Sequence, residues 1–184
     1  MVKEPRAGRV KTRLGRSIGM TRAAWWYRHQ TARLLRRLQD PRWSLVLAVS
    51  PDHEGLQSRV WPGHLPRLPQ GEGDLGERMA RMLRSTSGPT VLIGSDIPDI
   101  RCKQIRASFD ALGQAPSVIG PAPDGGFWQD GLRHTARAPV NLFKGVRWSH
   151  AQTLADTLPT LQQPVARVET LSDVDEARDL IQRA

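Results

Sequence analysis

Residues 90–98 read Thr-Val-Leu-Ile-Gly-Ser-Asp-Ile-Pro, and this stretch decides the fold class that the sequence predicts. Thr90 to Ile93 form a short apolar run, which predicts a buried strand. The run ends in Gly94-Ser95-Asp96, and Pro98 turns the chain directly after the carboxylate. A polar turn after a buried strand is typical of open α/β sheets, in which ligands bind beyond the carboxyl ends of the strands.

Outward from this strand, apolar strands alternate with helical segments, which predicts an α/β fold with three layers: a mostly parallel sheet covered by helices on both faces. Strands are expected at 44–50, 90–93, 117–120, 127–132 and, as an edge strand, 164–168, with a further short strand near Arg67. Helices are expected at 21–38, 75–83, 101–112, 149–161 and from 175 onward. Thr21 and Ser149 are the expected N-caps, and Trp25 is expected on the apolar side of the first helix. The first strand is nearly absent, since only Met1 and Val2 precede Lys3, so either it is a stub or the true start lies upstream.

The length and composition indicate one globular domain over residues 1–184. No apolar run approaches the roughly 20 residues that span a bilayer, and the basic N-terminus has no apolar stretch behind it, so no secretory signal is predicted. The single cysteine excludes an internal disulfide and fits a reducing compartment. We therefore expect a cytoplasmic protein without a membrane span.

The positive charge lies in the first quarter of the chain. Residues 1–42 hold 12 Lys/Arg and 2 Asp/Glu, whereas the remaining residues hold 15 and 16. A basic surface of this kind attracts phosphate, either on a nucleic acid or on a small molecule. The arginines of the expected first helix are interpreted mainly as its solvated face.

The first loop, from Lys3 to Arg16, is the predicted phosphate site. Gly8 permits close backbone approach, and Thr12 offers a hydroxyl donor. Lys3, Lys11 and Arg13 offer cations that suit a diphosphate. The loop is neither a Walker A motif, since Val10 precedes the Lys-Thr pair, nor a GxGxxG motif. A solvated basic loop is the alternative interpretation.

Three carboxylate motifs are the other candidates for chemistry. Asp96 is well placed for Mg²⁺ or Mn²⁺, which prefer oxygen ligands, although it could instead cap the following turn. Asp173 and Asp175 could share a cation, but they also stand where helix-capping acids belong. Asp124 precedes two glycines whose amides could face a ligand, with its carboxylate on the ligand's hydroxyls. On local grounds an ordinary turn is the favoured interpretation of this last motif.

In their order along the chain, the motifs resemble those of the bacterial GT-A-fold, glycosyltransferase-like proteins of the nucleotide-diphospho-sugar transferase superfamily, some of which are assigned to arsenosugar biosynthesis. The resemblance covers nearly the whole chain. Its blocks are Lys3-Glu4-Pro5 with Gly8-Arg9-Val10-Lys11-Thr12-Arg13-Leu14, Gly73-Asp74-Leu75-Gly76-Glu77-Arg78-Met79, Gly94-Ser95-Asp96-Ile97-Pro98, Gly120-Pro121 with Asp124-Gly125-Gly126-Phe127, Trp148-Ser149, and Asp173-Val174-Asp175 with Asp179-Leu180.

On the nucleotide side, the resemblance implies a single GT-A-like domain with a divalent cation near Asp96, shared with Asp173 or Asp175. It assigns the nucleotide to the loop that holds Lys3, Gly8, Lys11, Thr12 and Arg13. It also assigns the base or the phosphates to a second block, which contributes Asp74 and Arg78.

On the acceptor side, the resemblance implies that Asp124 to Phe127, with Gly125 and Gly126, line the acceptor or sugar site, together with Trp148. Asp96 and Asp124 are the candidate catalytic residues. The chain departs from the family pattern here: after the two glycines it reads Phe127-Trp128-Gln129-Asp130 rather than two aromatics and an apolar pair, and His150 follows Ser149 where the family has Thr. These departures leave the acceptor open.

Three functions remain as hypotheses. In glycosyl transfer, a nucleotide sugar is the donor to a small-molecule acceptor, and the loop and metal neutralise the departing diphosphate. In nucleotidyl transfer, the same residues hold a nucleoside triphosphate and the product is pyrophosphate. Nucleic-acid binding without catalysis is the third hypothesis, and it is disfavoured because it leaves the carboxylate motifs unexplained. The oligomeric state is not predicted.

Overall fold

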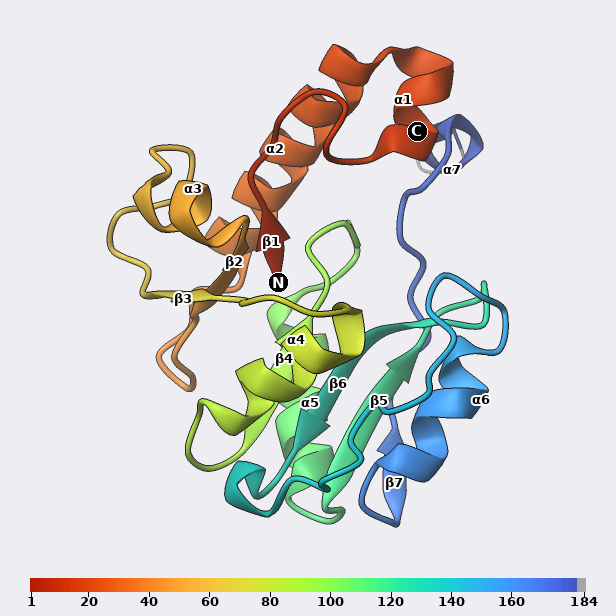
Figure 1. Cartoon of the computed structure of the whole chain (residues 1–184). Coiled ribbons are helices and arrows are strands. Elements are labelled where there is room, and N and C mark those ends of the chain that lie inside the picture. Colours follow the sequence, from red (N-terminus) through yellow and green to blue (C-terminus); the bar gives the residue numbers. More distant parts are fainter. Residues whose placement is uncertain (182–184) are drawn as a thin grey trace. The chain divides into compact units, whose positions relative to one another are not determined.

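A computed structural model of the chain describes residues 1–181 and confirms the α/β class (Figure 1). The residue contacts divide the chain into two compact units. The first unit contains Met1–Pro69, Ser95–Asp99 and the segment that begins at Asp173; the second contains Gln70–Gly94 and Ile100–Ser172. The expectation of a single domain over residues 1–184 is not decided by this division and stays a prediction.

The sheet of the first unit has three parallel strands. They are β1 (Val2–Lys3), β2 (Leu47–Ser50) and β3 (Arg67–Pro69), in the order β1-β2-β3. The expected short strand near Arg67 is therefore present, and β1 spans only Val2–Lys3. Val2 pairs with Val49 and both are buried, so β1 reaches the core that the longer β2 helps to form.

Four helices belong to this unit: α1 (Thr12–Ile18), α2 (Met20–Arg37), α3 (Asp52–Gln57) and α7 (Ala177–Ile181). Two expectations are wrong here, because the basic loop ends before α1 and because α2 begins before Thr21, which is not its N-cap. Leu14 is fully buried against α2 and the chain near Val174, which gives α1 a hydrophobic anchor of its own. Gly19, at φ +93°, then interrupts the helical backbone between α1 and α2.

The expected position of Trp25 on the apolar side of α2 is wrong. Ala24, Leu34 and Leu35 are buried as expected, but Trp25 is 65% exposed and its ring lies 4.0 Å from that of His29. Ala23 and Ala24 are both buried, and successive helical residues are rotated by about 100°, so Trp25 lies beyond the edge of the buried stripe. Tyr27, about one turn after Ala23 and Ala24, occupies the buried aromatic position instead.

The sheet of the second unit has four strands in the order β4-β6-β5-β7. They are β4 (Thr90–Ile93), β5 (Ser117–Pro121), β6 (Phe127–Leu132) and β7 (Val165–Arg167). β6 runs antiparallel to both of its neighbours, whereas β5 and β7 are parallel. Among the described strands, three of the five pairings are parallel, and both antiparallel pairings involve β6.

Helices α4 (Leu75–Arg84) and α5 (Cys102–Leu112) pack against this sheet, and α6 (Thr153–Thr157) lies at its β7 end (Figure 1). Short 3₁₀ helices occupy Thr135–Arg137 and Leu158–Thr160. The expected helix 149–161 is thus shorter, and Ser149 is not its cap because its backbone is left-handed at φ +56°. No helix within residues 1–181 is long and apolar enough to cross a membrane, and the expected cytoplasmic location stays a prediction.

Strand β6 buries two polar side chains, Gln129 and Asp130, each 1% exposed. Neither side chain has a hydrogen-bond partner among residues 1–181. Burial raises the pKa of Asp130 from its ordinary value of 3.8 to about 8. These residues are two of the departures from the family pattern, and the structure places them inside the sheet rather than on a surface.

Asp130 should make the stability of the protein fall as pH rises. Between pH 4 and 8 the folded carboxyl keeps a proton that the unfolded chain releases, so each pH unit costs up to roughly 1.4 kcal/mol. Asp130→Asn should flatten the slope of the unfolding free energy over this interval, measured by urea denaturation. Asp110→Asn, which alters an exposed carboxyl on α5, is the matched control and should keep the wild-type slope. Equal slopes for wild type and Asp130→Asn would contradict the assignment.

Candidate functional site

Two carboxylate segments lie side by side in the first unit. The backbone N–H of Val174 donates to the carbonyl oxygen of Asp96 at 3.2 Å. The side chain of Val174 is fully buried against α1 and α2. Its neighbours Asp173 and Asp175 are partly exposed, with 36% and 37% of each side chain accessible. Carboxylate oxygens of these two residues and of Asp96 all lie within 4.8 Å of one another.

The ammonium of Lys11 lies among the three carboxylates. Its Nζ is 2.5 Å from Oδ2 of Asp96, 2.6 Å from Oδ1 of Asp175 and 3.8 Å from Oδ2 of Asp173. The Lys11 side chain is only 7% exposed. The sequence predicts a phosphate contact for Lys11, but in the structure the ammonium contacts carboxylates. Its backbone is left-handed, at φ 45°, where α1 begins.

Charge compensation holds this cluster together. Burial lowers the pKa of Lys11, but the adjacent carboxylates of Asp96 and Asp175 outweigh burial and the net pKa is raised. For Asp175, burial raises the pKa, but the charge of Lys11 and then that of Arg13 bring the pKa below its ordinary value. Nη1 of Arg13 lies 3.1 Å from Oδ2 of Asp175. Lys11 is therefore a fixed positive charge and Asp175 a fixed negative one at neutral pH.

The three carboxylates also suit a hard divalent cation. Mg²⁺ takes oxygen ligands at about 2.0–2.1 Å, so ligand oxygens around one ion are separated by up to about 4.2 Å. The observed limit of 4.8 Å needs only a small contraction. Asp96, Asp173 and Asp175 therefore fit Mg²⁺ or Mn²⁺ once the Lys11 ammonium has left the space between them.

Tyr27 and Ser95 are parts of this site that the sequence analysis missed. The Tyr27 hydroxyl accepts a hydrogen bond from the backbone N–H of Lys3 at 3.0 Å and lies 2.7 Å from Oγ of Ser95. It thereby joins the first loop to the turn that carries Asp96. Burial raises the pKa of Tyr27, which keeps this hydroxyl protonated. A signal was available, because a tyrosine on the buried face of a helix needs a partner for its hydroxyl.

The remaining predicted residues of the first loop lie at the surface. Lys3, Gly8 and Thr12 are exposed, and Gly8 has φ +78° with open space where a side chain would stand. Two further loop arginines pair with the Glu54 carboxylate of α3, at 3.2 and 3.5 Å. These are Arg6 and Arg9. Much of the basic charge is thus compensated within the unit, while Lys3 and Thr12 face solvent.

The predicted base or phosphate block has a structural role in the second unit. Asp74 is the N-cap of α4: its Oδ1 accepts from the N–H of Glu77 at 2.8 Å, and the Glu77 carboxylate accepts from the N–H of Asp74 at 2.8 Å. Such a capping box satisfies two helix-end donors reciprocally. Arg78 lies one turn into α4, partly buried, and its Nε has no hydrogen-bond partner among residues 1–181.

The motif at Asp124 forms a turn, as the local interpretation of the sequence predicts. Oδ1 of Asp124 accepts from the N–H of Gly126 at 2.9 Å. Gly125 has φ +86°, and its carbonyl accepts from the N–H of Leu154 at 2.8 Å, which fixes the turn against the start of α6. Asp124 itself is exposed, so the turn does not exclude a contact between its carboxylate and a ligand.

Aromatic packing brings the predicted acceptor residues together. The Trp148 ring lies 6.2 Å from that of Phe127 and 6.1 Å from that of Phe143, both in edge-on contact. Gly76 of α4 allows this approach, since a side chain there would lie 2.9 Å from both Trp148 and Phe143. The Trp148 indole N–H is buried without a hydrogen-bond partner within residues 1–181.

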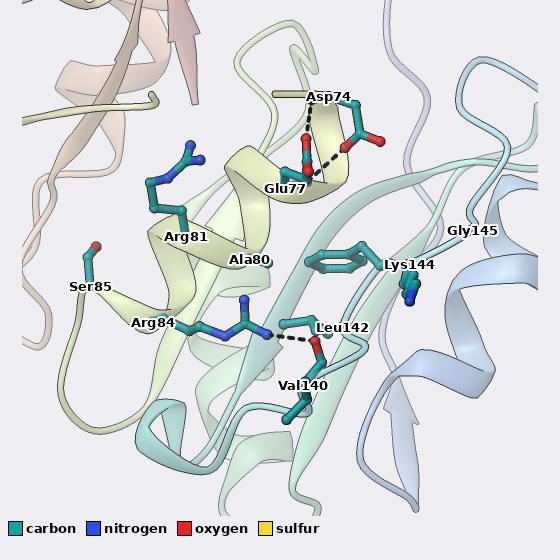
Figure 2. Close-up of a pocket in the computed structure, with 11 residues that line it drawn as sticks. Asp74, Glu77, Ala80, Arg81, Arg84, Ser85, Val140, Leu142, Lys144 and Gly145 are labelled. Atoms are coloured by element: carbon teal, nitrogen blue, oxygen red, sulfur yellow. Dashed lines mark hydrogen bonds between the residues drawn. The ribbon is translucent and has the colours of Figure 1, made fainter. Parts of the chain in front are cut away.

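A pocket of about 710 Å³ lies beside this aromatic group, between α4 and the chain from Val140 to Gly145 (Figure 2). Phe143 is part of its wall. Figure 2 shows the capping box at one end and Arg84 near Val140, whose carbonyl it reaches at 3.4 Å. The pocket size is in the range of small-molecule sites. Its lining residue Phe143 contacts Trp148, and the sequence analysis did not single out the lining from Val140 onward.

Comparisons with known proteins agree with this architecture. Residues 33–150 match a family model described as "Uncharacterized protein conserved in bacteria (DUF2064)". The chain belongs to this family. The matched region contains Asp74, Asp96 and Asp124, whereas Lys11 and Asp175 lie outside it. A search of curated proteins finds no significant match.

A solved structure extends the likeness to nearly the whole chain. It is the crystal structure of a "putative nucleotide-diphospho-sugar transferase" from Desulfovibrio desulfuricans G20, which is 31% identical and has a TM-score of 0.82. The alignment covers 95% of this chain and 80% of that one. The resemblance to the nucleotide-diphospho-sugar transferase superfamily, and the fold it implies, are therefore confirmed.

The Tyr27 hydroxyl should contribute measurably to the stability of the first unit. Tyr27→Phe leaves the Lys3 N–H and the Ser95 hydroxyl without this buried partner, and each such loss costs about 1–3 kcal/mol. The unfolding free energy in urea should fall by about that amount. Trp25→Phe, which keeps an aromatic ring at an exposed position of the same helix, should alter it by under about 0.5 kcal/mol. If both variants are equally stable, the bridge is unimportant.

Proposed function

We propose that the protein is a metal-dependent transferase that uses a nucleotide-diphosphate sugar as donor. One observation carries the proposal: the three carboxylates of Asp96, Asp173 and Asp175 converge beside a basic loop. Carboxylates suit the metal, and the loop suits the diphosphate. The likeness to a protein named as a nucleotide-diphospho-sugar transferase supports the same reading.

Each predicted residue has a role in this proposal. A divalent cation, when bound, neutralises charge that develops on the leaving diphosphate. Asp96, Asp173 and Asp175 are its ligands, and the loop cations hold the phosphates. The loop contacts are Lys3, Gly8, Lys11, Thr12 and Arg13. Asp74 and Arg78 belong to the second unit, and their contact with a nucleotide stays a prediction from the sequence.

On the acceptor side, Gly125, Gly126, Phe127 and Trp148 hold the small molecule. An acceptor hydroxyl oxygen forms a bond to the anomeric carbon of the sugar, while the bond from that carbon to the diphosphate oxygen breaks. The bonding electron pair leaves with the nucleoside diphosphate. The proton of the hydroxyl passes to a general base, and the exposed carboxylate of Asp124 is the candidate that the sequence offers for this role.

Nucleic-acid binding is a weaker candidate on the contacts of the first loop. Arg6 and Arg9 pair with Glu54, Lys11 is buried, and Arg13 pairs with Asp175. These cations are turned toward carboxylates of their own unit, which reduces the charge available to a polyanion. A small phosphate compound that enters with a metal needs fewer free cations.

A thermal-shift panel of nucleotides and nucleotide sugars with Mn²⁺ or Mg²⁺ tests the proposal. A ligand at about 100 times its dissociation constant stabilises by roughly 2.7 kcal/mol. For a chain of this size the melting temperature should rise by about 5–10 °C. No shift with any nucleotide would exclude the transferase function. Turnover with a binding donor then separates two chemistries, since glycosyl transfer releases a nucleoside diphosphate and nucleotidyl transfer releases pyrophosphate.

Asp96→Asn should remove the metal-dependent part of the shift, because an amide is a weaker ligand than a carboxylate and carries no charge. The metal-independent part should remain. Asp110→Asn, on the surface of α5, is the matched control and should keep the full shift. If Asp96→Asn responds to metal and nucleotide as wild type does, Asp96 is not a ligand.

A further inference from the structure

We propose that Lys11 is a displaceable internal cation: its ammonium occupies the carboxylate cluster when no metal is bound, and it transfers to the nucleotide diphosphate when a divalent cation enters. This inference rests on the proposed function and adds a mechanism to it. Metal and nucleotide would then bind cooperatively, because the metal replaces the ammonium as partner of the carboxylates and the diphosphate replaces the carboxylates as partner of the ammonium.

The geometry makes the ammonium and a divalent cation mutually exclusive. Nζ of Lys11 lies within 2.6 Å of carboxylate oxygens of both Asp96 and Asp175, and 3.8 Å from one of Asp173. A metal ion that uses the same three carboxylates needs the space that Nζ occupies. The metal ion and the Lys11 ammonium would also repel each other strongly if both lay within this partly buried site. Lys11 must therefore withdraw before the metal is fully coordinated.

The lysine side chain is suited to such a movement. Four flexible methylene groups carry a compact charge, so Nζ can travel several ångströms while the backbone stays in place. The backbone is held by α1, whose Leu14 is fully buried, and by the left-handed turn at Lys11 itself. Gly8 and Thr12, which lie in the same loop, are exposed.

A withdrawn ammonium needs a new anion. In the cluster Lys11 is stabilised by two close, partly exposed carboxylates, and separating such a pair is unfavourable unless each partner is compensated. A metal compensates the carboxylates, and a diphosphate bound at the exposed loop compensates the ammonium. Saturating metal alone can displace the ammonium into solvent, but both sets of charges are fully compensated only when both ligands are present. Coupling energies between two sites are commonly 1–3 kcal/mol, which corresponds to 5–150-fold in affinity.

Chemical labelling of lysines on the wild-type protein tests the movement directly. The chain has four lysines, and Lys3, Lys103 and Lys144 are exposed whereas Lys11 is buried. Acetylation followed by mass spectrometry should modify these three quickly and Lys11 slowly. Saturating Mn²⁺ without nucleotide should raise the labelling rate of Lys11 at least several-fold and leave Lys103 and Lys144 unchanged. A Lys11 that stays protected under saturating Mn²⁺ overturns the exchange.

Metal affinity provides the second test, with electron paramagnetic resonance of free Mn²⁺ as its readout. Lys11→Met removes the competing charge and keeps much of the side-chain volume, so it should bind Mn²⁺ at least 10-fold more tightly than wild type. Lys103→Met on α5 is the matched control and should bind as wild type does. Addition of UDP, GDP, CDP or ADP should raise the Mn²⁺ affinity of wild type, and this gain should shrink in Lys11→Met.

The outcomes separate this inference from the proposed function. If wild type and Lys11→Met bind Mn²⁺ equally, the exchange is wrong while the metal site stands. If neither binds Mn²⁺ and no nucleotide shifts the melting temperature, the proposed function fails and the exchange with it. If a nucleotide binds wild type without metal while Lys11 stays protected, Lys11 is a permanent substitute for the metal, which also overturns the exchange. If Lys11→Met does not fold, the labelling experiment decides alone.

Discussion

The buried ammonium of Lys11 among three carboxylates is the interaction on which the first unit depends. It ties together three stretches of chain that are far apart in sequence: the first loop, the turn at Asp96 and the segment at Asp175. Around it, Tyr27 bridges the loop to the turn, and Val174 inserts into the adjoining core. A buried charge cluster of this kind contributes little net stability, but removal of one member leaves the others uncompensated. It therefore specifies one arrangement of these segments rather than simply strengthening it.

Much of the fold was predictable because strong local patterns marked it. The apolar run at Thr90–Ile93, the helix over Leu75–Arg84 and the strand at Phe127–Leu132 lie close to where the sequence places them. The predictions from the sequence were wrong where a buried residue lies within a mainly polar stretch of the chain. Leu14 makes α1 a helix inside an otherwise basic stretch, and Trp25 leaves the buried stripe to Tyr27. Neither choice follows from propensity, because tertiary contacts decide both.

The candidate site was predictable in its members more than in their contacts. Asp96, Asp173 and Asp175 could be proposed together because each lies at a ligand-binding end of the fold or in a paired-carboxylate motif. Nothing in the sequence indicates that Lys11 would turn inward, since its choice between carboxylates and phosphate depends on which anion is closest. The roles of Asp74 and Asp124 were ambiguous for a related reason. A helix cap or a turn uses the same short carboxylate that a ligand contact would use, so the sequence does not distinguish them.

The long sequence separation within the cluster has a consequence for synthesis of the chain. Lys11 and Asp175 are 164 residues apart. At 5–20 residues per second, the ribosome adds the second partner roughly 10–30 s after the first. Throughout that time Leu14 and Ala23 lack the Val174 side chain that completes their packing. The carboxylate cluster is thus among the last features that a nascent chain can assemble, and any chain released before residue 173 lacks two of its three carboxylates.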